Sequence, residues 1–285
     1  MPKRPLRTLI VFSEKWPRAL SILRITVLGC GGSGGTPLLG GPTGHGDWGA
    51  LNPAEFRNRR TRSSIIVQTP ESKRLLVDAG PDLRTQLLTN GVGRIDDLLL
   101  THAHADHVMG LDEVRPLNRA LGAAIPTHGT AVTLADVQQR FGYAFRPPTP
   151  GFFRPCLIPN TVRPGETVRM AGMNVELFSQ DHRVMETLGL RVGRFAYSTD
   201  VVRLPEESLV RLTGLDTWVV GCFQRRPHPV HAHVDQVLEW VDRLRPRRTV
   251  LTHMGTDLEW SWMAANLPVG VEAAYDGMVL DVPVA

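Results

Sequence analysis

The chain has 285 residues and a formal net charge of +4, from 32 Lys and Arg against 28 Asp and Glu. This length is enough for one large domain or two small ones, and the modest positive charge mildly favours an anionic substrate but is far below that of a protein that coats nucleic acid. No apolar run approaches the ~18 residues of a transmembrane helix, so no membrane partner is expected.

Cysteine usage and the N-terminus together indicate the compartment. The three cysteines, Cys30, Cys156 and Cys222, are odd in number and form no Cys-x-x-Cys pair, which supports neither a disulfide framework nor a cysteine zinc site. We therefore expect a cytoplasmic protein. The first residues carry basic side chains before a short apolar patch, but charged residues interrupt that patch and no cleavage site is clear. The sequence predicts an N-terminal extension over 1–23 and one domain over 24–285.

The first expected strand, Arg24–Leu28, runs into a glycine-rich segment. Its glycines match the Gly-x-Gly-x-x-Gly pattern of dinucleotide sites at Gly29, Gly31 and Gly34. Such a turn must open a helix, whereas Thr36-Pro37 and further glycines forbid regular helix here. We therefore disfavour a nicotinamide site and expect an irregular loop over 30–62 that forms a rim of the active site.

Two paired strands follow, over Ser63–Thr69 and Arg74–Val77, and a helix is expected over Asp82–Thr89. Asp78 stands at the end of the second strand. A carboxylate there can orient metal-bound imidazoles from behind, and an Asx-turn is an equal alternative.

The strongest motif is Thr101-His102-Ala103-His104-Ala105-Asp106-His107, which follows the apolar run Leu98–Leu100. If Ile95–Thr101 is a buried strand, His102 and His104 point to the same side and can share one ion. A turn after His104 would bring Asp106 and His107 to the other side of the same cavity. This spacing suits two adjacent metals better than one, and the alternative is a solvated histidine-rich turn.

The middle of the chain is less informative. Leu111–Leu121 is expected to be helical, and Ile125–Thr127 to be a short strand before His128, which we interpret as structural because it has no clustered partner. The proline-rich segment 146–155 cannot be regular structure and is expected to be a packed loop.

The second half is rich in expected strands separated by Gly or Pro turns: 161–163, 167–170, 174–178, a hairpin of 187–192 with 194–197, 217–220, 249–251 and 279–282. Helices are expected near 205–212 and over Val234–Leu244, whose apolar residues mark one face. Three further residues of metal-binding type, His182, Asp200 and His253, each follow an expected strand. Residues at strand ends can converge at one edge of a sheet, and seven His and Asp ligands suit two borderline divalent ions.

The chain resembles the metallo-β-lactamase superfamily of metallohydrolases in the order of its motifs. These are a strand, a glycine loop, Leu-Leu-Val-Asp-Ala-Gly, the histidine motif, His182, Ser-Thr-Asp200 and Leu-Thr-His253. The resemblance implies an α/β, four-layer αββα sandwich with the metals at one edge. It implies that the first metal is held by His102, His104 and His182. It implies that the second is held by Asp106, His107 and His253. Asp200 would bridge both. The expected cofactors are two divalent ions, Zn²⁺ first and Mn²⁺ second.

Within the superfamily, the tail is more specific. Three segments resemble the phosphoribosyl cyclic phosphodiesterases of phosphonate breakdown and their relatives: Pro229–Asp235, Arg248–Met254 and Tyr275–Met278. Members of that group often carry early-loop cysteines that hold a structural zinc. Asn52 and its neighbours supply none, so no extra structural metal is expected.

The resemblance implies a phosphoric diester hydrolase that attacks a small, cyclic phosphodiester with metal-activated hydroxide. His231 matches the family's catalytic histidine and would assist the leaving group, and Asp106 is assigned to catalysis as well as to the metal. His228 and His233 are competitors for the role of His231, because sequence alone does not separate them.

Other functions and partners remain open. The nearest enzyme rival is a transfer-RNA 3′ endonuclease, which a long projecting RNA-gripping arm would favour, and no clear arm is expected. A thioester hydrolase would need a longer C-terminal helical part, and a degenerate, non-catalytic metal-binding module would not keep all seven ligand positions. A small anionic phosphodiester is thus the expected partner, nucleic acid is the less favoured one, and a homodimer is left open.

Overall fold

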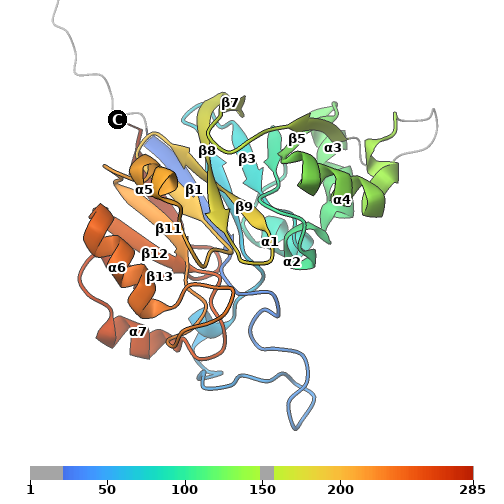
Figure 1. Ribbon diagram of the computed structural model, residues 1–285. Coiled ribbons are helices and arrows are strands. Elements are labelled where there is room, and N and C mark those ends of the chain that lie inside the picture. The colour runs from blue at the N-terminus through green and yellow to red at the C-terminus, as the bar shows by residue number, and fades with distance from the viewer. Residues whose placement is uncertain (1–21, 148–156, 285) are drawn as a thin grey trace, which may run out of the picture.

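The computed structural model describes residues 22–147 and 157–284 (Figure 1). The predicted N-terminal extension lies outside the described residues, except that Ile22 and Leu23 already belong to the first strand. The predicted packed loop over 146–155 also lies outside them, apart from its first two residues. Within the described residues, no helix is long and apolar enough to cross a membrane.

The fold is built on two mixed β-sheets of seven strands each among the described residues. The first sheet has the order β14 (Val279–Pro283), β1 (Ile22–Gly29), β2 (Ser64–Gln68), β3 (Arg74–Val77), β4 (Asp97–Leu99), β5 (Ile125–Gly129), β6 (Leu157–Thr161). The second has the order β13 (Val271–Ala273), β12 (Arg248–Thr252), β11 (Thr217–Gly221), β10 (Phe195–Ser198), β9 (Glu186–Val192), β8 (Met173–Asp181), β7 (Thr167–Met170).

Alternation of apolar side chains along the strands explains why the sheets pack face to face. In β3, Leu75 and Val77 pack into the apolar core that the two sheets share. Leu76, between them, packs into the apolar layer beneath the helices of the first sheet. All three are fully buried. Strands with both faces covered read as continuous apolar runs, which is the pattern of this part of the sequence.

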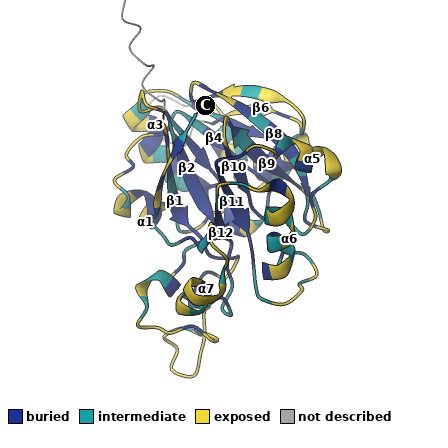
Figure 2. Cartoon of the chain, turned by 90° about the vertical axis from the view of Figure 1, so that its left-hand side faces the viewer, coloured by how far each residue is buried: buried dark blue, intermediate teal, exposed yellow. Residues whose placement is uncertain are grey.

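Helices cover the outer face of each sheet. The first sheet is covered by α1 (Leu83–Thr89), α2 (Ala105–Val108), α3 (Arg115–Leu121) and α4 (Ala131–Phe141). The second is covered by α5 (Glu206–Arg211), α6 (Val234–Leu244) and α7 (Trp260–Asn266). Short 3-10 helices lie at Phe56–Asn58, Leu111–Val114 and Gly142–Phe145. Figure 2 shows buried residues on the strands and exposed residues on the outward side of the helices. The predicted four-layer αββα sandwich is confirmed.

The elements differ from the sequence-based expectation in four places. The strand expected over 161–163 lies earlier, because β6 ends at Thr161. β4 is shorter than the predicted strand Ile95–Thr101, because the N–H of Thr101 donates to the Asp78 side chain at 2.8 Å instead of to a neighbouring strand. The helix α4 was not predicted, although Thr130 caps its N-terminus by accepting from the N–H of Thr133. The short edge strand β13 was not predicted either.

The loop between β1 and β2 contains a hairpin that projects away from the sheets (Figure 1). Leu38 and Asp47 pair there, with each N–H donating to the other's carbonyl at 2.9 and 2.8 Å. We call residues 38–47 the projecting hairpin. Sequence analysis predicts no clear arm here, because the glycines and prolines of this segment carry no strand pattern.

Strand direction explains where a site can form. β3, β4, β5 and β6 run parallel in the first sheet, and β10, β11, β12 and β13 run parallel in the second. Loops that leave the carboxyl ends of parallel strands gather at one edge, which is where ligands bind in open α/β sheets.

Candidate metal centre

All seven predicted ligands lie at this edge, and each comes from a segment that follows a strand. His102 and His104 follow β4, and α2 supplies Asp106 and His107 directly afterwards. The second sheet supplies the other three ligands, since His182 follows β8, Asp200 follows β10 and His253 follows β12.

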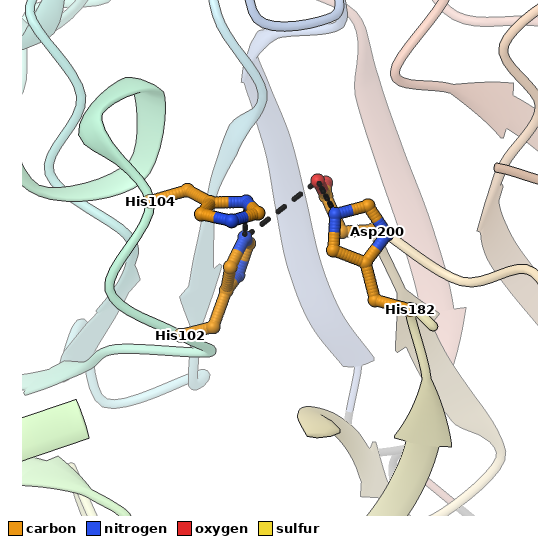
Figure 3. A group of neighbouring side chains, drawn as sticks. All are labelled: His102, His104, His182 and Asp200. Carbon is orange, nitrogen blue, oxygen red and sulfur yellow. Dashed lines mark hydrogen bonds and ion pairs between the residues drawn. The ribbon is translucent and has the colours of Figure 1, made fainter. Parts of the chain in front are cut away.

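The first group of side chains contains three histidines and one carboxylate (Figure 3). Its ligand atoms, from His102, His104, His182 and Asp200, all lie within 4.8 Å of one another. Oδ2 of Asp200 lies 3.6 Å from Nε2 of both His102 and His182. Nε2 of His102 lies 3.0 Å from Nδ1 of His104. Three imidazoles and an oxygen around a common point form a donor set typical of zinc.

The second group contains two carboxylates and two histidines. Its members are Asp106, His107, Asp200 and His253. Oδ1 of Asp200 lies 2.9 Å from Nε2 of His253 and 3.2 Å from Nε2 of His107. The carboxylate of Asp200 therefore belongs to both groups, with one oxygen toward each.

Unpaired buried atoms test whether a cation fits. Oδ2 of Asp106 and the Nε2 atoms of His107 and His253 are buried and have no hydrogen-bond partner among the described residues. Such groups are costly to bury unless something else binds them. All three atoms belong to the second ligand group, so the donor set fits a divalent ion.

The electrostatics of the centre lead to the same conclusion. Burial opposes the protonation of His253, but the carboxylates of Asp200 and Asp106 outweigh it and raise the pKa of His253 to about 9. Burial likewise opposes the ionisation of Asp200, yet His253 and His107 hold its pKa well below the usual range. The carboxylates thus require positive charge beside them, and a metal would displace the histidine protons that otherwise supply it.

Asp78 orients the ligands of the first sheet from behind. Nδ1–H of His107 donates to Oδ2 of Asp78 at 2.7 Å, and Thr101 donates to the same carboxylate through its N–H and its hydroxyl, both at 2.8 Å. The hydroxyl of Thr101 in turn lies 3.0 Å from Nδ1 of His102. Of the two predicted roles of Asp78, these contacts support the orientation of the imidazoles. These bonds leave Nε2 of His107 and of His102 directed into the centre.

Three residues of the centre have left-handed backbone. Asp78, Asp200 and His253 have φ values of 64°, 48° and 55°. This region is unfavourable for side chains other than glycine, by roughly 1–3 kcal/mol each, and it persists where surrounding contacts hold the residue. Each sharp turn aims a side chain across the edge of a sheet, and these three are among the seven non-glycine residues with positive φ in the part of the chain that the structure describes.

His231 lies beside both ligand groups. Its ring centroid is 4.7 Å from that of His182 and 4.8 Å from that of His253. His228 stacks on it at 5.1 Å. His233 is the N-cap residue of α6, and among the described residues it has no ring contact with the centre. The structure thus separates the two competitors: His228 is adjacent to His231 and His233 is not.

Two residues at the centre carry no pattern in the sequence. Phe223 packs against His231 and His253, with ring centroids 4.9 and 6.2 Å away. The hydroxyl of Tyr197 is buried and makes no hydrogen bond within the part of the chain that the structure describes. Burial raises the pKa of Tyr197 above its usual value, and the nearby charge of Asp78 raises it further. Only the folded arrangement reveals them, because both follow ordinary apolar strand positions.

Comparisons with known proteins agree with this geometry. The family model described as "Beta-lactamase superfamily domain" matches residues 73–254. A solved structure of a diphosphatase from the PhnP family is 31% identical, with a TM-score of 0.82 over 92% of this chain and 98% of that chain.

Two curated relatives are similar over part of their length. An octanoyltransferase of Porphyromonas gingivalis is 29% identical over 90% of this chain and 51% of that protein. A ribonuclease Z of a Bradyrhizobium species is 31% identical over 46% of this chain and 43% of that protein. The chain thus spans about half the length of the first of these relatives and matches less than half of the second.

We predict that Asp200→Ala weakens two metal sites whereas His182→Ala weakens one, because only Asp200 contributes to both ligand groups. Zinc titration against a competing chelator measures both affinities, and Asp242→Asn on the exposed face of α6 serves as the carboxylate control. Two tight sites in the Asp200→Ala protein would contradict the bridging assignment.

A second prediction concerns Asp78. Asp78→Asn keeps the size of the side chain but removes the charge that accepts from His107, so zinc affinity should fall by roughly 10- to 100-fold while both sites remain. The same titration reads this out. Unchanged affinity, with the fold intact by circular dichroism, would mean that Asp78 only shapes its turn.

Proposed function

This chain belongs to the β-lactamase superfamily and has the fold and the two His/Asp clusters of a metal hydrolase, and we propose that it hydrolyses a small anionic phosphodiester. The observation that carries the proposal is the pair of ligand groups that share Asp200. Two such groups suit hydrolysis, because a pair of bound divalent ions lowers the pKa of a water and stabilises the charge that develops on phosphoryl oxygens.

The residues of the centre favour zinc, with manganese as the second choice. Imidazole nitrogens predominate among the seven ligands and sulfur is absent from them, a donor set that borderline divalent ions accept. Oδ2 of Asp106 is buried, makes no hydrogen bond within the described residues and lies 3.2 Å from Nε2 of His107. We assign to the carboxylate of Asp106, besides its place in the second ligand group, the acceptance of a proton from the attacking water.

The charge of the projecting hairpin favours a small substrate over a polymer. The projecting hairpin, residues 38–47, contains no Lys or Arg (Figure 1). An arm without positive charge gains nothing from counterion release, which supplies most of the affinity for a nucleic-acid backbone. The 31% identity to a diphosphatase of the PhnP family also supports a small phosphorylated substrate.

His231 is proposed to assist the leaving group. Burial, and then the charge of His253, lower the pKa of His231 to about 3, so its free imidazole is neutral. An anionic phosphoryl group bound beside it favours the imidazolium, which can give its N–H proton to the leaving oxygen and return to the neutral imidazole.

Specific observations favour two other substrates. The diphosphatase relative supports a diphosphate linkage, which presents the same phosphoryl centre with a phosphate leaving group. The partial match to a ribonuclease Z supports an RNA substrate, although it covers less than half of this chain. Nothing in the geometry of the centre favours a thioester, and a non-catalytic module would not explain the retained ligands.

A substrate screen tests the proposal. We expect the zinc- or manganese-loaded protein to hydrolyse nucleoside cyclic phosphates or small linear diesters faster than dinucleoside diphosphates, transfer-RNA precursor or thioesters. Values of kcat/KM give the ranking, and the Asp200→Ala protein gives the background. Transfer-RNA precursor turned over orders of magnitude faster than every small diester would contradict a small substrate.

The role of His231 predicts a dependence on the leaving group. His231→Ala should retain both metals yet lose ~10²–10⁴-fold in kcat on a nucleoside cyclic phosphate, whose alkoxide leaves poorly, and far less on bis(nitrophenyl) phosphate. His45→Ala, in the projecting hairpin, is the matched control and should change neither rate. Equal losses on both substrates, or loss of metal, would remove His231 from this role.

A further inference from the structure

Phe223 lies two residues after β11, where its backbone joins two segments of the centre. Its N–H donates to the carbonyl of Ala232 at 2.8 Å, and its own carbonyl accepts from the N–H of Gly255 at 2.8 Å. Ala232 is the neighbour of His231, and Gly255 follows the ligand His253 by two residues. The backbone of Phe223 therefore sets the distance between the segment of His231 and the segment of the last ligand.

The side chain of Phe223 stacks on His231. Their ring centroids are 4.9 Å apart and their planes differ by 28°. His228 lies 4.9 Å from Phe223 and 5.1 Å from His231, so the three rings form one cluster. Aromatic rings in such offset contacts restrain one another's orientation.

His231 differs from the other imidazoles in how it is held. Nδ1 of His107 and Nδ1 of His182 donate to Asp78 and to the carbonyl of Val230, both at 2.7 Å. Among the described residues no hydrogen bond reaches the ring of His231. Its orientation therefore depends on the rings against it, and Phe223 is the one of these that is neither a predicted ligand nor ionisable.

Two glycines leave room for the ring of Phe223. A Cβ on Gly32 would lie 2.8 Å from Cε2 of Phe223, so the ring itself requires glycine at this position. A Cβ on Gly255 would lie 2.9 Å from the carbonyl oxygen of Phe223 and 3.3 Å from Cε2 and Cζ, so both the backbone and the ring of Phe223 limit the side chain there. Neither glycine has a positive φ, so the backbone conformation is not the reason for glycine. Gly32 lies in the glycine-rich segment after β1, which the sequence left without a function once a dinucleotide site was disfavoured.

We propose that Phe223 is the positioning residue for His231: its ring, packed against Gly32 and Gly255, holds the His231 imidazole against the metal centre. This inference rests on the proposed role of His231 in the hydrolysis of a phosphodiester. It assigns the glycine at position 32 to the packing of that ring. A ring misplaced by about 1 Å can cost on the order of 100-fold in rate, because proton transfer requires close alignment.

The test removes the ring while keeping an apolar side chain. Phe223→Leu should retain both metals and lose about 10- to 100-fold in kcat on a nucleoside cyclic phosphate, with a much smaller loss on bis(nitrophenyl) phosphate. Phe223→Tyr keeps the ring and should retain most of the activity. Phe56→Leu, at an exposed phenylalanine in the first 3-10 helix, is the matched control and should behave as the unmodified protein.

Two further variants separate positioning from general damage. In the His231→Ala background, Phe223→Leu should have little additional effect, because residues that act through one another are not additive. Gly32→Ala places a Cβ 2.8 Å from Cε2 of Phe223, so the ring must shift, and this variant should reproduce the leaving-group dependence without any change at Phe223. It also supplies the test if the Phe223→Leu protein does not fold.

The outcomes distinguish the inference from the function on which it rests. Suppose that His231→Ala shows the leaving-group dependence. If Phe223→Leu and Gly32→Ala then lower kcat equally on both substrates, or if their effects add fully to that of His231→Ala, the positioning role is wrong and the proposed function stands. If His231→Ala itself lowers kcat equally on both substrates, the role of His231 is wrong and the inference about Phe223 is overturned with it.

Discussion

The carboxylate of Asp200 is the contact on which the rest of the centre depends. It is 2% exposed, and one of its oxygens faces the ligands His102 and His182 while the other faces His107 and His253. An isolated buried carboxylate is very costly, so it is kept only where positive charge surrounds it. The histidines that surround Asp200 come from both sheets, and a cation held by them would link the two halves of the molecule.

The fold brings these residues together through the direction of its strands. The parallel strands of each sheet end at the same edge, and the first residues beyond them include Asp78, Asp200 and His253, all with left-handed backbone. The apolar core between the sheets provides the rigidity that holds such strained residues in place. Stability and chemistry are thus separated along each strand, with packing in the middle and ligands at the carboxyl end.

The sequence predicts the parts of this arrangement that are local. His102, His104, Asp106 and His107 lie within six residues, so their spacing alone indicates a shared site, and apolar strands mark the places where further ligands follow. The resemblance to a family then connects residues far apart in the chain. These predictions account for the sandwich and for the convergence of all seven side chains.

Long-range contacts are what the sequence does not predict. The carbonyl of Val230 orients His182 across 48 positions, and Phe223 meets Gly32 only after both sheets have formed. A phenylalanine after an apolar strand gives the same local pattern whether it packs in the core or against the imidazole of His231. The helix α4 is a different case, because its cap Thr130 and its buried Leu134 and Val137 were present in the sequence as ordinary helix signals.

Anomalous diffraction from crystals grown with zinc tests the central claim most directly. Data collected above and below the zinc absorption edge locate each ion independently of any assumption about its ligands. The account predicts two peaks on either side of the Asp200 carboxylate, one within reach of His102, His104 and His182 and one within reach of Asp106, His107 and His253. A single peak, or two peaks that Asp200 does not touch, would contradict it.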